Sequence, residues 1–513
     1  MAWSAALLEY LEGDRSAEVW LVEVYQSSSE PGADGYTMSN CAGYGDEVLV
    51  AGPPRISGAR VTPVVWSSTI GACSIQLVGD LSTAMQHIAR GTVCRVLLGR
   101  PTVPTGRLLW GQPGLPFETV FWGQVWSLTG SAPSYVLELR DPIQAIDGRM
   151  AIGVTELFSG LGATTLTADA AAADTTLTVA STTNWVYDQF GSGYGLLKIE
   201  NEYIAFTGTT ATTFTGCIRG SLGTTADAYV IGDAVAGVAL LQGHPLDVAR
   251  RVLLSHSEAG NGAFDTYDYR WGLAIRQTLV DVEDIERWKV IVAVASGSYV
   301  WNVVSETIQD APGSWLTGML SRAGLFLTTR HGLLTIRAAT SPLVTLGDPP
   351  LLDLTITDDD IVAGWGSISV EAWASEYSVE YLLVAATTES GTTTTSATGD
   401  GLYAATLPAA RLIEYDVSDL VRQNESEVRT EMLNRLALMA QRVPEAVTFT
   451  AAGMRLAQLT PGDVVYFETT RAGLRFAYPP RRCWVAQVSP DWSRNTVQVR
   501  VLAYPGTFEE FES

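Results

Sequence analysis

Residues 197–208 read Leu-Lys-Ile-Glu-Asn-Glu-Tyr-Ile-Ala-Phe-Thr-Gly, and residues 217–226 read Cys-Ile-Arg-Gly-Ser-Leu-Gly-Thr-Thr-Ala. Apolar and polar residues alternate over Tyr203–Thr207, as they do over Thr176–Val179. This period of two predicts β-strands. Alanine, threonine and glycine dominate the surrounding segment, and charge nearly vanishes between residues 151 and 187. We therefore expect residues 151–236 to form a small β module inserted between other domains.

The turns of this module have their own signals. Gly220 and Gly223 permit tight turns, and Arg219 can brace the carboxylate of Glu200 or Glu202 by charge-assisted hydrogen bonds. The run Gly191–Gly195 has the glycine content of a phosphate loop. It precedes a strand-like segment and not a helix, so a helix N-terminus to hold phosphate is missing. We interpret it as a flexible turn.

The regions on both sides of the module predict a mainly β, multidomain protein. Residues 1–150 begin with a short amphipathic helix over 1–13 and continue as strands separated by Gly, Pro and Ser, which indicates an antiparallel sheet or barrel. Residues 237–345 carry two helical patterns, around 246–253 and 315–323, and then a hairpin with its turn at 330–332. This segment is expected to be an α+β domain.

Residues 346–513 return to strands, with one interruption. Apolar residues at helical spacing predict a long helix over 424–443, where Asn424 and Glu427 resemble a capping box and Pro444 ends the helix. The low-complexity stretch 387–400 cannot bury a core, so we expect a mobile loop or the arm of a hairpin.

Composition excludes several classes of protein. The chain of 513 residues has 32 Lys+Arg against 55 Asp+Glu, a formal charge of −23, so tight binding of a nucleic-acid backbone is not expected. Charged residues are only 17%, which suggests that other subunits cover much of the surface. The start lacks a basic segment and no run of 18 apolar residues exists, so we expect neither a secretory signal nor a membrane span. Isolated cysteines are expected to be buried free thiols: Cys41, Cys73, Cys94, Cys217 and Cys483.

A search for catalytic, metal-binding and cofactor-binding motifs predicts none of these sites. The four histidines lack metal-ligand spacing, and neither lysine lies in a Gly-Lys-Ser/Thr motif. Asp358–Asp360 can bind a cation, although a solvated turn is favoured because the alternating ligand pattern is missing. Glu200 and Glu202 can serve a glycosidase, although a chance pair is favoured. Three tryptophans can form a sugar platform or pack at a barrel or subunit interface: Trp110, Trp122 and Trp126.

The segment 174–235 resembles a small β module that recurs in bacteriophage tail and tail-tip proteins. The resemblance lies in Ile199–Glu202 as "Ile-x-x-Glu", in Arg219–Thr224 as "Arg-Gly-x-x-Gly-Thr", and in the closing pair Gly232–Asp233. Further stretches are similar to tail-tip and baseplate hub proteins. They are Phe121–Val125 with Leu137–Pro142, the stretch 315–337, Leu459–Val465, Trp484–Val488 and Thr496–Val501.

This resemblance implies a non-enzymatic structural protein of the virion tail, assembled in the bacterial host cytoplasm. It implies a baseplate hub that closes or extends the tail tube and acts in host entry and genome ejection. It further implies a homotrimer whose protomers each give two tail-tube-like β-barrel domains, here residues 1–150 and 346–513. The implied partners are the tail tube or distal tail protein and tip fibre or central spike proteins.

DNA is expected to pass through such a hub without binding, since an acidic lumen repels it. Acidic residues on the polar faces of predicted strands are the lumen candidates: Glu23, Glu138, Glu371, Glu376, Glu380 and Glu468. Two alternatives remain open, a distal tail adaptor that forms a hexameric ring and a carbohydrate-binding or glycoside-active protein. The number of tube-like domains separates the first alternative from the hub, because a hub needs two per chain and an adaptor needs one.

Overall fold

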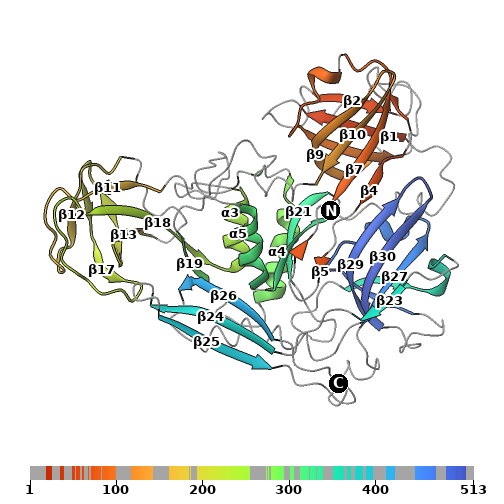
Figure 1. The fold of residues 1–513 in the computed structure, drawn as a ribbon. Coiled ribbons are helices and arrows are strands. Elements are labelled where there is room, and N and C mark those ends of the chain that lie inside the picture. The colour runs from red at the N-terminus through yellow and green to blue at the C-terminus, as the bar shows by residue number, and fades with distance from the viewer. Residues whose placement is uncertain are drawn as a thin grey trace.

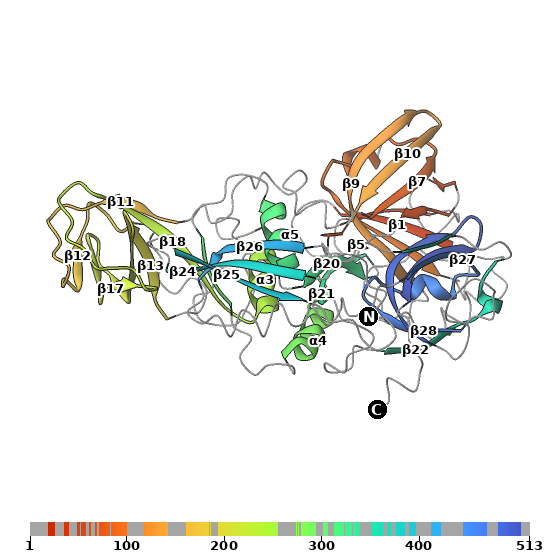
Figure 2. The ribbon, with the colours of Figure 1, turned by 60° about the horizontal axis from the view of Figure 1, so that its bottom comes forward.

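Strands dominate the chain, which confirms the predicted mainly β, multidomain class (Figure 1). The computed structural model describes residues 19–25, 35–39, 49–51, 53–57, 61–62, 67–68, 71–82, 84–99, 117–141, 161–183, 185, 193–254, 273, 275, 279–293, 301–305, 312–322, 324–330, 332–338, 351–362, 367–370, 376–384, 389–396, 412–421, 445–468 and 481–503. The strands of residues 19–140 lie side by side with those of residues 351–370 and 445–503, and the module whose last strand is β18 lies at the opposite end of the molecule (Figures 1 and 2).

The N-terminal strands pair in a closed circuit, in the order β10-β9-β8-β1-β2-β3-β7 and back to β10. Apolar side chains at alternate positions, such as Ile75 and Leu77, point into this circuit and are fully buried. The strands are β1 (Val19–Tyr25), β2 (Gly35–Ser39), β3 (Leu49–Val50), β7 (Ala72–Val78), β8 (Val93–Gly99), β9 (Phe117–Ser131) and β10 (Ser134–Arg140).

The C-terminal strands form a second unit in the order β22-β28-β29-β30-β27-β23, and Ile361 adds an isolated bridge to Ala451 of β27. They are β22 (Leu351–Ile356), β23 (Ser367–Val370), β27 (Glu445–Ala452), β28 (Val464–Phe467), β29 (Arg481–Asp491) and β30 (Thr496–Ala503). The short strand β4 (Arg55–Ser57) pairs with β7 and, at Arg55, with β29.

The two β units share one hydrophobic core. Trp20 of β1 and Trp492, just after β29, meet edge to face with ring centroids 5.1 Å apart. Both indole rings are almost fully buried. Burial of large aromatic surfaces is among the strongest contributions to a core, so this contact holds the two units against each other.

A mixed α and β region lies between these units and the module. It contains α3 (Pro245–Leu254), α4 (Val282–Ala293), α5 (Pro312–Arg322) and the hairpin of β20 (Leu325–Arg330) and β21 (Leu333–Ala338). The predicted helices around 246–253 and 315–323 and the predicted hairpin are thereby confirmed. Further strands of this region are β19 (Trp301–Ser305), β24 (Glu376–Val384), β25 (Glu389–Ser396) and β26 (Leu412–Val421).

The module of residues 161–236 has its own core of aromatic rings. The centroid of Phe214 lies 4.8 Å from that of Phe206 and 4.7 Å from that of Trp185. Its strands are β11 (Ala163–Thr165), β12 (Thr176–Thr178), β13 (Gly195–Ile199), β14 (Glu202–Phe206), β15 (Gly208–Thr209), β16 (Thr213–Thr215), β17 (Ile218–Ser221) and the first part of β18 (Ala234–Gly243). β18 continues beyond the module to pair with β19.

Several predictions have a clear outcome here. In the low-complexity stretch, β25 pairs with β24 as a hairpin arm, which was one of the two expectations. Cys73, Cys94, Cys217 and Cys483 are buried free thiols. Cys41 and the predicted helices 1–13 and 424–443 lie outside the described residues, and the domain boundaries stay a prediction. No helix in the described part of the chain is long and apolar enough to cross a membrane.

Candidate functional site

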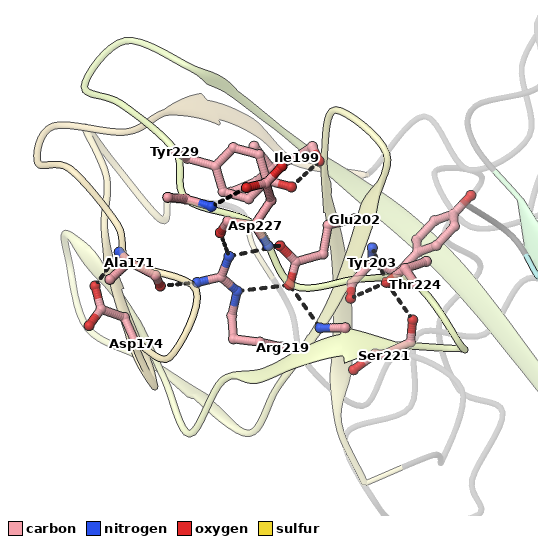
Figure 3. Close-up of polar contacts among 12 residues, drawn as sticks. Ala171, Asp174, Ile199, Glu202, Tyr203, Arg219, Ser221, Thr224, Asp227 and Tyr229 are labelled. Carbon is pink, nitrogen blue, oxygen red and sulfur yellow. Dashed lines mark hydrogen bonds and ion pairs between the residues drawn. The ribbon is translucent and has the colours of Figure 1, made fainter. Parts of the chain in front are cut away.

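The residues of the "Arg-Gly-x-x-Gly-Thr" and "Ile-x-x-Glu" motifs meet at one point of the module (Figure 3). Glu202, which begins β14, and Arg219 on β17 form a bidentate pair. Arg219 Nε donates to Glu202 Oε1 at 2.8 Å, and Arg219 Nη2 donates to Glu202 Oε2 at 2.7 Å. Glu200, the other predicted partner, lies exposed in the turn between β13 and β14 with a φ of 49°.

Backbone groups complete this cluster around the ion pair. The amides of Gly220 and Asp227 donate to Glu202 Oε1 and Oε2 at 2.8 and 3.2 Å. Arg219 Nη1 donates to the carbonyl of Ala171, and Nη2 to that of Asp227. The ring of Tyr229 lies beneath the guanidinium, 5.5 Å from Cζ. One arginine therefore joins β14, β17 and two loops that are distant in sequence.

The glycines of the motif are required by the turn that follows Arg219. Gly220 has a φ of +62°, and a Cβ at this position would lie 2.7 Å from the carbonyl oxygen of Thr224. Thr224 Oγ1 in turn accepts from the amide of Tyr203 at 3.1 Å and donates to the carbonyl of Ser221 at 2.8 Å. The motif thus combines a brace, a left-handed turn and a hydroxyl that fastens the turn to β14.

Electrostatics keep this pair ionised. Burial alone would raise the pKa of Glu202, but hydrogen bonds from Arg219, Gly220 and Asp227 outweigh it and lower the pKa below its usual value. The Glu202 carboxylate likewise raises the pKa of Arg219 against the effect of burial. Burial and the nearby Glu202 charge raise the pKa of Tyr229. The carboxylate therefore stays charged and fully hydrogen-bonded at neutral pH.

This arrangement supports a structural role for the cluster. Glu202 is 1% exposed, and both of its oxygens accept bonds from the protein, so no lone pair is directed at a substrate. Among the residues that the structure describes, no group of three or more His, Cys, Asp or Glu is placed to hold a metal ion. The Asp358–Asp360 segment forms a short 3-10 turn, in which Asp360 caps Thr357 and pairs with Arg455 at 2.5 Å.

The acidic lumen candidates fall in different places. Glu23 lies on the face of β1 opposite the core and pairs with Arg95 at 2.7 Å. Glu138 on β10 and Glu468, just after β28, are half-buried. Glu376 and Glu380 belong to β24, but their side chains, like all of Glu371, lie outside the described residues. In a single chain these residues do not define an axis, so the lumen assignment stays a prediction.

A second buried ionic cluster was not predicted from the sequence. Arg337 on β21 donates from Nε to Asp284 of α4 at 2.9 Å and from Nη1 to Asp463 at 2.7 Å. It also donates to the carbonyl of Pro461 at 3.2 Å. Arg330 adds a second cation to Asp284 at 3.2 Å. Burial alone would raise the pKa of Asp284, but Arg337 and Arg330 outweigh it and lower this pKa.

The same hairpin contacts both β units. Next to Arg337, Phe326 packs edge to face on Trp484 of β29 with centroids 5.7 Å apart. At the hairpin turn, Gly332 has a φ of +80°, and a Cβ there would lie 2.0 Å from the amide nitrogen of Trp122 on β9. The β20–β21 hairpin is thus packed against α4, the C-terminal unit and the N-terminal unit.

Comparisons with known proteins identify similar structures but no sequence relative. No family model and no curated protein matches the sequence. A tail protein from Neisseria meningitidis has a TM-score of 0.40 at 11% identity, over 95% of this chain and 96% of that one. The 43 kDa tail protein of prophage MuSo2 from Shewanella oneidensis has a TM-score of 0.37 at 11% identity, over 94% of this chain and 98% of that one. A component of the E. coli type VI secretion system has a TM-score of 0.31 at 8% identity, over 90% of this chain and 78% of that one.

Tail proteins, the class that the sequence motifs resemble, are thus among the solved structures similar to this chain. The description of the E. coli protein also names a structural similarity to tail proteins gp27 and gp5 of bacteriophage T4. All three TM-scores lie below 0.5, so none of these structures defines the function of the chain.

Proposed function

We propose that this chain is a structural protein of a bacteriophage tail, the baseplate hub at the tip of the tail tube. The observation that carries the proposal is the pair of β units within one chain, packed through Trp20 and Trp492. A hub trimer needs two tube-like domains per protomer to match a hexameric tube, whereas an adaptor ring needs one. The motif residues of the module add support, because Arg219 and Glu202 give the motif a defined structural role.

The proposed assembly is a homotrimer in the virion tail, in contact with the tail tube or distal tail protein and with tip fibre or spike proteins. Its test is the particle mass from light scattering at micromolar concentration, with and without tail tube protein. The expected mass is three chains of 55.0 kDa. A stable ring of six chains would favour the distal tail adaptor, and a monomer under both conditions would contradict the hub.

The proposed passage of DNA rests on the net charge of −23. Acids near the axis repel the DNA backbone and keep it from binding. Glu138 and Glu468 are better candidates than Glu23, because Arg95 already neutralises Glu23. Replacing Glu138, Glu380 and Glu468 by Lys should slow genome ejection in an infection assay while particles still assemble. A normal ejection rate would contradict an acidic lumen built from these residues.

A further inference from the structure

Trp126 on the outer face of β9 lies close to two arginines. Arg90 Cζ is 4.1 Å from the centroid of the indole ring, and Arg140 Cζ is 5.8 Å from it. Both distances are within the range of a cation–π interaction. Arg90 is exposed, whereas Trp126 and Arg140 are half-buried. The two arginines therefore present a pair of positive charges at the surface of a chain whose net charge is strongly negative.

The fold holds both arginines in place. Arg140 is the last residue of β10 and pairs in register with Gln124 of β9. Arg90 lies in a turn that is fastened to β9 by two backbone bonds, from Gly91 to Val125 at 2.8 Å and from Val125 to Thr92 at 2.9 Å. Strand register and a pinned turn thus fix the backbone of both arginines next to Trp126.

The charges of these arginines are not neutralised within the described part of the chain. Neither Arg90 nor Arg140 makes an ion pair with a described residue, whereas Arg95 on the neighbouring strand β8 pairs with Glu23. Stacking on an indole leaves the guanidinium N–H groups free to donate in the plane of the group. Both guanidiniums lie beside the same indole ring, so their positive charges are concentrated in one place on the surface. A carboxylate bound at these guanidiniums would use the free donors and offset their positive charge.

We propose that the Arg90–Trp126–Arg140 stack binds a carboxylate of a second copy of this chain. The chemistry of the stack selects a carboxylate, because a guanidinium fork binds that group with two parallel hydrogen bonds. Charge complementarity selects a second copy, because 55 acidic against 32 basic residues make another protomer's surface a ready source of carboxylates. Aromatic residues and arginines are also the types enriched in protein interfaces. This inference rests on the proposed homotrimer and identifies one contact in it.

The test compares self-association of the full chain with that of a double variant, Arg90→Gln/Arg140→Gln. The control is Arg287→Glu on α4, an exposed arginine outside this surface, which lowers the net charge by the same amount. Sedimentation velocity over a range of concentrations, at low and at high salt, gives the association constant. We expect the double variant to associate roughly ten- to a hundredfold more weakly, with a smaller salt dependence, and the control to match the wild type.

The remaining outcomes separate this inference from the trimer itself. If the wild type forms trimers and the double variant does so with equal affinity and salt dependence, the carboxylate site is overturned and the trimer stands. If the wild type stays monomeric at every concentration, both fail. An equal loss of affinity in Arg287→Glu would show an effect of net charge alone and would also overturn the site. Circular dichroism of the double variant should be unchanged, because its side chains lie on the outer face.

Discussion

Among the residues that the structure describes, Arg219 and Arg337 are buried arginine side chains that pair with carboxylates over very different spans of sequence. Arg219 and its partner Glu202 are 17 residues apart and belong to one module. Arg337 reaches Asp284 over 53 residues and Asp463 over 126 residues, and it joins β21 to α4 and to the C-terminal unit. The module brace therefore stabilises one local unit, whereas the Arg337 cluster stabilises the packing of units against each other.

The largest expected effect comes from Arg337→Ala. The substitution removes the cation that Asp284 and Asp463 share, while both carboxylates stay buried. Breaking such a buried pair costs about 3–5 kcal/mol. We expect chemical denaturation to show this loss in the transition that involves α4 and the C-terminal unit. Arg494→Ala is the control, because Arg494 is 82% exposed and its pair with Asp491 should contribute less than about 1 kcal/mol. Equal shifts in the two variants would contradict the role of the Arg337 cluster.

A smaller and more local effect is expected from Glu202→Gln. The amide lacks the charge and one of the acceptors that Arg219, Gly220 and Asp227 use, so we expect a loss of about 2–3 kcal/mol. Hydrogen exchange should show faster exchange in residues 161–236 and no change in the Arg337 cluster. Glu200→Gln is a matched control in the adjacent turn. The comparison between the two clusters fails if Glu202→Gln destabilises α4 and the C-terminal unit as well.

Acid should weaken both clusters, since the folded-state pKa of Glu202 and that of Asp284 lie below their usual values. A lowered folded pKa gives stability that is present above the unfolded pKa of about 4 and is lost as the pH falls through the folded value. Thermal unfolding from pH 7 down to pH 3 should therefore show a loss of stability that begins near pH 4 to 5. The Glu202→Gln variant should lose the part of this pH dependence that comes from the module. A pH profile equal to that of the wild type would contradict the role of Glu202.

The smallest effect on the rest of the molecule is expected when residues 160–236 are replaced by a short Gly-Ser linker. The core of Phe206, Phe214 and Trp185 belongs to the module alone, and β18 keeps its pairs with β19 beyond residue 238. The free energy of unfolding of the remaining chain should change by less than about 1 kcal/mol. A deletion variant without cooperative unfolding would place the module in the main core.

The sequence predicts local features of this fold much better than contacts between distant segments. Period-two strands, α3, α5 and the hairpin turn follow from patterns a few residues long, and Arg219 with Glu202 was found because the motif spans one module. Glu200 and Glu202 could not be separated by sequence, because the choice depends on which residue starts β14 and which lies in the turn. The pairing of Arg337 with Asp463 has no local signal, since only the packing of the hairpin brings the two residues together.

β18 has a mechanical consequence. Its first residues pair with β11 and β13 of the module, and its last residues pair with β19 of the central region. At this connection the chain therefore passes from the module into the central region as one paired strand and not as a flexible linker. We expect a load applied at the far end of the module to be carried along the backbone of β18 and to shear its ladder of hydrogen bonds. We expect such a load to tilt the module and the central region together, as one lever.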